Sequence, residues 1–233
     1  MDAMKKVQVW DLPTRLFHWL LALAIPSAIA TGMIGAELIV WHGRLGLFIL
    51  GLLAFRLVWG FIGPANARFA RFVRGPAAIR AYLRGEWKGI GHNPLGALSV
   101  LAMLGLIALQ VGSGLFADDD IAFRGPLADV LSDDWSSRLT SLHSLAQYGL
   151  IGAVVLHAIA IIYYVRVRRD NLLRPMVVGY KQIPSDAPDV ASFNPARIAL
   201  AFALAAAIAG AVVYAAAGGL HPAPAPVQAA PAW

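Results

Sequence analysis

Residues 141–164 have the sequence SLHSLAQYGLIGAVVLHAIAIIYY, and this stretch decides the fold expected for the chain. It is apolar and long enough to cross a bilayer as one helix. His143 and His157 lie 14 residues apart within it. At 100° per residue both rings leave nearly the same face, and they are separated by about 21 Å along the helix axis. Ionisable side chains inside a spanning helix are costly and usually functional, so each ring predicts a partner at its own depth.

The composition places the chain in a membrane. Of its 233 residues 59% are hydrophobic and only 14% are charged, which is typical of a protein that crosses the lipid bilayer several times. The chain has no cysteine, which excludes disulfides, thiolate-held iron–sulfur clusters and covalently attached haem. The net charge of +6 comes from basic residues that cluster between apolar runs, so we expect membrane lipid and no nucleic acid as a partner.

Five apolar runs predict five transmembrane helices. The expected fold class is all-α integral membrane, with helices over residues 16–34, 38–62, 94–116 and 141–164 forming a bundle within residues 1–182. A cytoplasmic linker (183–195), a fifth transmembrane helix (196–217) and an Ala/Pro-rich periplasmic tail (218–233) follow. The first run could also be a cleaved signal peptide, but His18 and Trp19 interrupt its apolar region and favour a retained helix.

Basic and acidic residues lie in different loops. Fifteen of the 19 Lys and Arg residues fall in the amino terminus and in segments 64–92 and 166–197, whereas segment 117–138 is rich in aspartate. Basic loops stay on the cytoplasmic side. We therefore expect a bacterial cytoplasmic (inner) membrane protein with its amino terminus in the cytoplasm and its carboxyl terminus in the periplasm.

This orientation sorts the intramembrane histidines into two pairs. His18 and His157 lie at the inner depth, and His42 and His143 lie near the outer surface. Two neutral imidazoles that face each other in an apolar bundle suit the two axial positions of a haem iron. We expect two haem b groups in a four-helix di-haem bundle. With both axial positions filled, the chemistry that remains is one-electron transfer.

A zinc or copper site and a proton relay are the other interpretations of the histidines. Zinc or copper needs three or four ligands at one depth, which pairs about 21 Å apart do not provide. Proton relay by the histidines would indicate a transporter instead. His92 and His221 fall in loops and are not expected to be axial ligands. For His92, in the sequence GHNP, a role beside a quinone is one interpretation and a solvated turn is the simpler one.

Arginines and glycines in the apolar runs could also serve the cofactor. Arg56 follows His42 by 14 residues and is expected near the same face, where it could pair with a haem propionate, and Arg44 is a second candidate. The alternative for both arginines is snorkelling to the membrane surface. Glycines near the histidines could admit a flat macrocycle or allow close helix packing: Gly43, Gly46, Gly51, Gly149 and Gly152.

Four segments together resemble a known family. They are VWDLPTRLFHWLLALAI (9–25), WHGRLGLFILGLLAFRLVWGFIGP (41–64), GHNPLGALSVLAMLGLIALQVGSGLF (91–116) and HSLAQYGLIGAVVLHAIAIIYYVRVRRDNLLRPMVVGYK (143–181). Over roughly residues 7–182 the chain resembles the bacterial cytochrome b561 superfamily, and most of all the b-type cytochrome subunits of nickel–iron hydrogenases. The resemblance implies a di-haem core that exchanges electrons with membrane quinone. His18, His42, His143 and His157 match its haem-ligand positions.

The function hypothesis follows from the histidine pairs and the resemblance together. We expect a respiratory-chain cytochrome b that transfers electrons between membrane quinone and a periplasmic redox protein, such as a c-type cytochrome or a hydrogenase-like subunit. The acidic segment would form part of the docking surface. A stand-alone superoxide:quinone oxidoreductase, as in members that resemble superoxide oxidase, is the alternative, and a proton-relay transporter is a third hypothesis. The fifth helix and the tail lie outside the resemblance.

Overall fold

The computed structural model describes residues 4–87, 91–121, 123–184 and 194–220. Within these ranges five helices are long and apolar enough to cross a membrane, which confirms the expected all-α membrane fold with five spans. The spans contain α1 (Leu12–Ile34), α2 (Ile39–Ile62), α5 (Pro94–Leu115), α6 (Asp133–Arg166) and α8 (Pro195–Tyr214). Shorter elements join them: β1 (Met4–Gln8), η1 (Ala36–Leu38), η2 (Ala65–Ala67), α3 (Phe69–Phe72), α4 (Pro76–Leu83), η3 (Ala128–Val130), α7 (Leu173–Val178), β2 (Tyr180–Pro184) and η4 (Ala215–Gly219).

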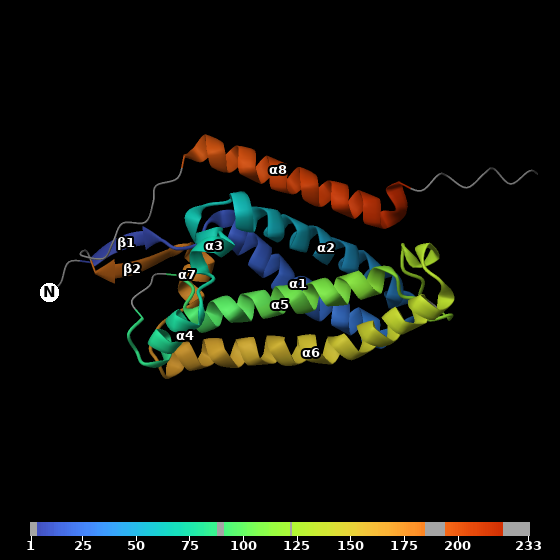
Figure 1. The fold of residues 1–233 in the computed structure, drawn as a ribbon, viewed down its shortest axis with the longest axis horizontal. Helices are drawn as coiled ribbons and strands as arrows, with labels where there is room; N and C mark the ends of the chain where they lie inside the picture. Colours follow the sequence, from blue (N-terminus) through green and yellow to red (C-terminus); the bar gives the residue numbers. More distant parts are fainter. Residues whose placement is uncertain (1–3, 88–90, 122, 185–193, 221–233) are drawn as a thin grey trace, which may run out of the picture.

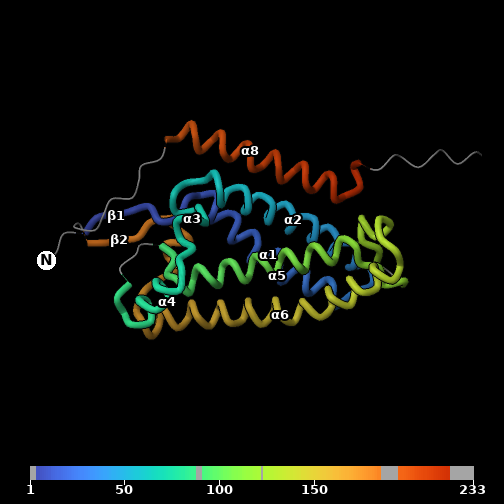
Figure 2. Tube along the Cα trace, viewed as in Figure 1, coloured from blue at the N-terminus to red at the C-terminus, as the bar shows by residue number. Residues whose placement is uncertain are grey.

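Helices α1, α2, α5 and α6 form the bundle, and α8 lies along the outside of α2 (Figures 1 and 2). We call the end of the bundle that carries β1, α3, α4, α7 and β2 the basic end. The opposite end carries the segment between α5 and α6 and is called the acidic end. Helices α1, α5 and α8 run from the basic end to the acidic end, and α2 and α6 run back.

The core of the bundle is formed by one apolar stripe from each of the four helices. Its buried side chains are Phe17, Leu21, Ala24, Ile25 and Ala28 of α1, Ile49 and Leu53 of α2, Leu104, Ile107 and Val111 of α5, and Leu150 of α6. Most other large apolar side chains of these helices are exposed on the outer faces. An exposed apolar surface around the whole bundle is what lipid requires, because the hydrocarbon layer is as apolar as leucine.

Helix α8 packs on α2 by small residues and one aromatic cluster. Ala205 is completely buried, and an added Cβ on Gly51 would lie 3.1 Å from Cγ2 of Val213. The ring of Phe202 lies 5.5 Å from that of Phe55, measured between centroids. The fifth span is therefore a layer outside the bundle, and Gly51 serves helix packing.

Three of the spanning helices begin with the same local device, an Asp or Asn cap followed closely by proline. Asp11 accepts from the Thr14 amide, Asn93 from the Gly96 amide, and Asn194 from the amides of Ala196 and Arg197. Proline stands in the first turn of each helix, where its missing N–H costs nothing. The caps determine the residue at which each of these helices begins.

Two helices begin earlier than expected. Helix α1 starts at Leu12 instead of residue 16, because Asp11 provides the cap. Helix α6 starts at Asp133 instead of residue 141, so its first two turns are polar and extend beyond the apolar run. Asp133 and Asp134 lie in this first turn, where carboxylates interact favourably with the helix dipole.

A small antiparallel sheet closes the basic end, which the sequence did not predict. Strand β1 pairs with β2, from Met4 opposite Pro184 to Gln8 opposite Tyr180. Helix α7 is held against α1 by the Trp19 indole, which donates to the Met176 carbonyl over 3.2 Å. Strand β2 runs past the expected start of the linker at residue 183. Residues 185–193 and 221–233, which include His221 and most of the expected tail, lie outside the described residues.

Asp11 joins the cap of α1 to α2, and its removal should destabilise the protein. Its carboxylate accepts from the Thr14 amide and hydroxyl and, over 3.1 Å, from the indole of the fully buried Trp59. We expect Asp11→Ala to lower the free energy of unfolding by roughly 2 kcal/mol, because a cap and a buried acceptor are lost together. Thermal unfolding of the detergent-solubilised protein measures this, with the exposed Asp134→Ala as control. Equal midpoints for the two variants would contradict the role assigned to Asp11.

Candidate haem-binding site

The structure brings the four intramembrane histidines together as two pairs. The ring centroids of His18 and His157 lie 6.3 Å apart, and those of His42 and His143 lie 5.8 Å apart. The first pair, near the basic end, is called the inner pair, and the second is called the outer pair. All four side chains are partly buried. In each pair, one ring belongs to the α1–α2 hairpin and the other to the α5–α6 hairpin.

The spacing within each pair suits two rings bound to opposite sides of one metal. A metal–imidazole nitrogen bond is about 2.0 Å long, and the ring centroid lies roughly 1 Å behind the nitrogen, so opposed ligands have centroids roughly 6 Å apart. Both observed separations match this value. Among the described residues no group of three His, Cys, Asp or Glu side chains gathers at one point, as a structural zinc site would require.

Hydrogen bonds orient both rings of the outer pair. Nδ1 of His42 lies 2.8 Å from the Ala28 carbonyl oxygen, and Nδ1 of His143 lies 2.8 Å from the Gln110 carbonyl oxygen. A carbonyl only accepts, so each Nδ1 carries the proton and donates it. Each Nε2 then keeps a free lone pair, which is the state required of a metal ligand.

Two glycines make these hydrogen bonds possible. An added Cβ on Gly32 would lie 2.7 Å from Nδ1 of His42, and one on Gly114 would lie 2.8 Å from Cε1 of His143. Each glycine stands four residues after the carbonyl that its histidine uses, one helical turn further along the same face. The two hairpins thus share one arrangement: a glycine on the first helix leaves room for an imidazole of the second helix to reach a backbone carbonyl of the first. Sequence reasoning missed both glycines.

A cavity of about 440 Å³ adjoins the outer pair. All four bundle helices line it, and its walls are mainly apolar, with the outer histidines and the side chains of Gln110 and Gln147 among the polar groups. Cofactor pockets have volumes of this order and the same mainly apolar lining. Gly46 also lines the cavity, and a Cβ there would meet nothing within 4 Å, which is consistent with the expected approach of a macrocycle.

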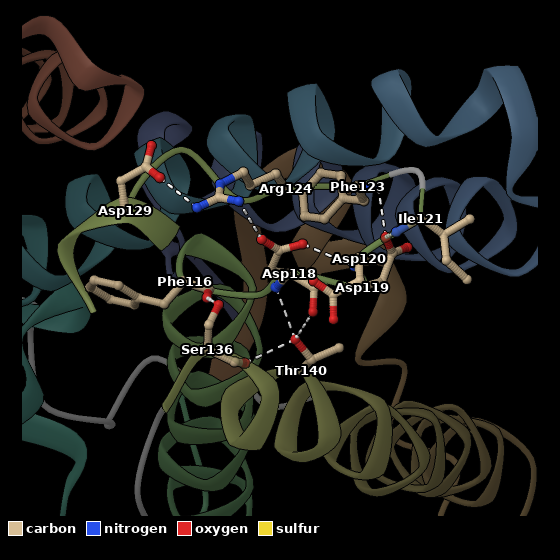
Figure 3. Close-up of polar contacts among 10 residues, drawn as sticks. All are labelled: Phe116, Asp118, Asp119, Asp120, Ile121, Phe123, Arg124, Asp129, Ser136 and Thr140. Atoms are coloured by element: carbon tan, nitrogen blue, oxygen red, sulfur yellow. Dashed lines mark hydrogen bonds and ion pairs between the residues drawn. The ribbon is translucent and has the colours of Figure 1, made fainter. Parts of the chain in front are cut away.

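The segment between α5 and α6, part of which Figure 3 shows, covers the acidic end of this cavity with Phe123, Arg124 and Pro126. Phe123 lies edge-on to His42, with ring centroids 6.0 Å apart. Next to it, Arg124 pairs with Asp118 over 2.8 Å and with Asp129 over 2.5 Å, and these carboxylates raise its pKa. Both Phe123 and Arg124 line the cavity. In the sequence, Arg124 could be singled out only as one of two basic residues in an acidic segment.

Side-chain hydrogen bonds fasten this covering segment to α6, as Figure 3 shows. The Thr140 hydroxyl accepts from the Asp118 amide and lies 2.9 Å from the Asp118 carbonyl oxygen, and the Ser136 hydroxyl donates to the Phe116 carbonyl. Asp119 accepts from the Phe123 amide and closes the turn between them. The cover is therefore tied to the same helix that supplies His143.

The two predicted arginines lie in different surroundings. Arg44 lines the cavity, but it is exposed and its guanidinium lies 4.9 Å from the Trp41 ring centroid. Arg56 is 3% exposed and its guanidinium lies 4.7 Å from the ring centroid of Phe69. The burial of Arg56 is incompatible with snorkelling to the membrane surface.

His92 lies in the bend before α5, as expected, but its ring is half-buried and less solvated than a free turn would be. Its ring packs between Trp10 and Phe72, with 4.5 Å between centroids on each side. Burial, with a smaller effect of the Arg56 charge, lowers the pKa of His92 to about 4, so the imidazole is neutral at pH 7. Trp10 in the link between β1 and α1, and Phe72 in α3, pack against this ring, which loop hydropathy alone did not indicate.

Comparisons with known proteins agree with this geometry. Residues 9–179 match the family model described as prokaryotic cytochrome b561. Curated relatives include the "Probable Ni/Fe-hydrogenase B-type cytochrome subunit" of Azotobacter chroococcum mcd 1, which is 27% identical over 78% of this chain and 91% of its own. Proteins of the same name from Azotobacter vinelandii (26%; 78% and 91%) and Rhodobacter capsulatus (25%; 77% and 83%) also match. No solved structure matches the chain.

The matched segment contains all four bundle helices and both histidine pairs, whereas α8 lies outside it. The relatives' names denote b-type cytochromes, whose cofactor is haem b, and both pairs have the donor set and spacing that a haem iron requires. The chain is therefore a multi-pass membrane cytochrome of electron transfer, and it belongs to the prokaryotic cytochrome b561 family.

Proposed function

We propose that this chain is a di-haem cytochrome b that transfers electrons between a redox protein outside the bacterial inner membrane and quinone within it. One observation carries the proposal: two imidazole pairs, each with the spacing of opposed axial ligands, lie at the two depths of one bundle. Haem with two imidazole ligands supplies one-electron chemistry without an open coordination position. His18 and His157 would hold the inner group, and His42 and His143 the outer group.

The protein's own contribution differs between the two sites. At the outer site, the Ala28 and Gln110 carbonyls hold the rings with Nε2 ready to bind. At the inner site, Nδ1 of His18 is buried and has no hydrogen-bond partner among the described residues. A ligating histidine whose other nitrogen donates to a carbonyl is more basic and better oriented. We therefore expect the outer site to be the more rigid of the two.

Charge and the names of the relatives support the choice of partner. With the basic end in the cytoplasm, the covering segment of the acidic end faces the periplasm, and Asp120, Asp133 and Asp134 are exposed there. The relatives' names support a hydrogenase-like partner, and we propose that it docks on this side. An acidic docking surface speeds association with a basic partner and makes the rate fall with ionic strength. Quinone would then react near the inner group.

Haem counting tests the two-site proposal. We expect two haems per wild-type chain, one in His157→Ala and one in His143→Ala, because each substitution removes one axial ligand. Pyridine haemochrome assays on chains quantified by amino-acid analysis give the ratio. One haem in the wild type would contradict the proposal. Quinone reduction by the purified protein with superoxide as the only reductant would favour the stand-alone oxidoreductase instead.

The glycine contacts predict a second result. In Gly114→Ala, the added methyl would lie 2.8 Å from the His143 ring, so the ring must leave the Gln110 carbonyl. We expect this variant to lose most of the outer haem and to keep the inner one. Gly105→Ala on the same helix is the matched control, because its Cβ would meet nothing within 4 Å. Equal haem content in the two variants would show that the outer site does not need the contact.

Orientation is open to labelling because the chain has no cysteine of its own. Asp134 and Arg84 are exposed at the acidic and the basic end. With an impermeant maleimide on intact spheroplasts, we expect Asp134→Cys to react at once and Arg84→Cys to react only after lysis. The reverse pattern would place the acidic end in the cytoplasm and remove the periplasmic partner from the proposal.

A further inference from the structure

Four buried polar atoms at the basic end have no hydrogen-bond partner in the described part of the chain, and they belong to Arg15, His18, Arg56 and His92. Among the described residues, neither Nη1 of Arg56 nor Nδ1 of His92 has a hydrogen-bond partner. Both groups lie near the ring of Phe72. The centroid of this ring is 6.0 Å from the Arg56 guanidinium and 4.5 Å from the centroid of the His92 ring. An unsatisfied buried polar group costs about 1–3 kcal/mol, and more when it is charged. Two such groups against the same aromatic ring indicate a ligand that satisfies both.

Asp11, the nearby carboxylate, does not fill this role. Its two oxygens already accept from the amide and hydroxyl of Thr14 and from the Trp59 indole. It makes no ion pair with Arg56 within 4 Å, although its charge acts on the guanidinium at longer range. Asp11 therefore lowers the cost of burying the Arg56 charge and leaves the Nη1 donor for another acceptor.

We infer that Arg56 and His92 together form a binding site for one carboxylate, and that its occupant is a propionate of the haem held by His18 and His157. This inference rests on the proposed di-haem function and adds a site to it. Arg56 provides a fixed positive charge with directional N–H donors, and His92 would provide a neutral donor in its Nδ1–H tautomer. Two donors without an acceptor of their own suit a carboxylate better than a neutral carbonyl or hydroxyl.

The depth of the site agrees with this occupant. Arg56 lies six residues before the end of α2, and His18 lies six residues after the start of the antiparallel α1. Each is therefore about 9 Å from the basic end of its helix. His92 lies two residues before α5 begins. The two donors thus bracket the interval between the depth of the inner histidines and the basic end, where the propionates of a haem held by these histidines would find room.

A redox titration of the two haems tests the inference. Arg56→Gln removes a positive charge beside the propionate, and the loss of this charge favours the ferric state. We therefore expect the midpoint potential of the inner haem to fall by about 59 mV, a tenfold change in its reduction equilibrium. His92→Phe keeps the aromatic packing but removes the donor, and it should shift the same transition in the same direction. The loss of one transition in His157→Ala identifies the inner haem.

Three variants complete the test. Arg56→Lys retains the charge and should keep most of the wild-type potential. If Arg56→Gln fails to fold, the shift expected in His92→Phe carries the test. Arg84→Gln removes an exposed charge from the same end and should leave both potentials unchanged. The double variant Arg56→Gln/His92→Phe should shift the potential by less than the sum of the single shifts, because both residues contact one ligand.

The outcomes separate this inference from the function on which it rests. Two haems in every variant with an unshifted inner potential would overturn the carboxylate site and leave the di-haem proposal standing. Fully additive shifts would show that Arg56 and His92 act on the haem independently, which also overturns a shared site. Fewer than two haems in the wild-type chain would overturn the function itself.

Discussion

Two hydrogen bonds from imidazole to backbone, His42 to Ala28 and His143 to Gln110, are the interactions on which the outer site depends. Each joins a histidine on the second helix of a hairpin to a carbonyl on the first. The bundle therefore assembles the site from two equivalent halves, each of which orients one ring before any metal arrives. Lipid supplies no competing donor or acceptor, so a backbone carbonyl near a buried imidazole becomes a dependable partner.

The same requirement explains the small residues around the site. Gly32 and Gly114 lie one turn beyond the acceptor carbonyls, and any side chain there would push the rings away. Close approach of neighbouring helices through glycine is common in membranes because no hydrophobic force drives the helices together. Here the close approach is between a helix and an imidazole from its neighbour. Gly51 has the ordinary packing role instead, since it faces α8.

The inner half of the bundle is organised differently. Its histidines meet at a similar spacing, but buried polar atoms at this end have no hydrogen-bond partner among the described residues, among them Nδ1 of His18 and Nη1 of Arg56. The outer site is covered by a segment held by Arg124 and its two aspartates, whereas the basic end is closed by β1, β2 and short helices packed around His92. At the outer site the histidines donate to backbone carbonyls of the chain itself, whereas at the inner site Nδ1 of His18 has no such partner among the described residues.

Most of the fold could be predicted from the sequence because length and hydropathy determine a spanning helix almost alone. The pairing of His18 with His157 and of His42 with His143 followed from depth, since antiparallel helices of known rise must bring equal depths together. The sequence could not show the β1–β2 sheet or the burial of His92, because both depend on contacts between distant segments. Gly32 and Gly114 were missed for the same reason: only the neighbouring helix reveals what a side chain there would strike.

The proposed function requires that every haem iron in this protein has an imidazole on each side. Carbon monoxide binds ferrous haem only where an axial position is open, so its addition to the dithionite-reduced protein is the most direct measurement. The account predicts that the absorption spectrum stays unchanged after carbon monoxide is added. A shifted Soret band in any part of the haem population would show an open position and contradict the pairing of the four histidines.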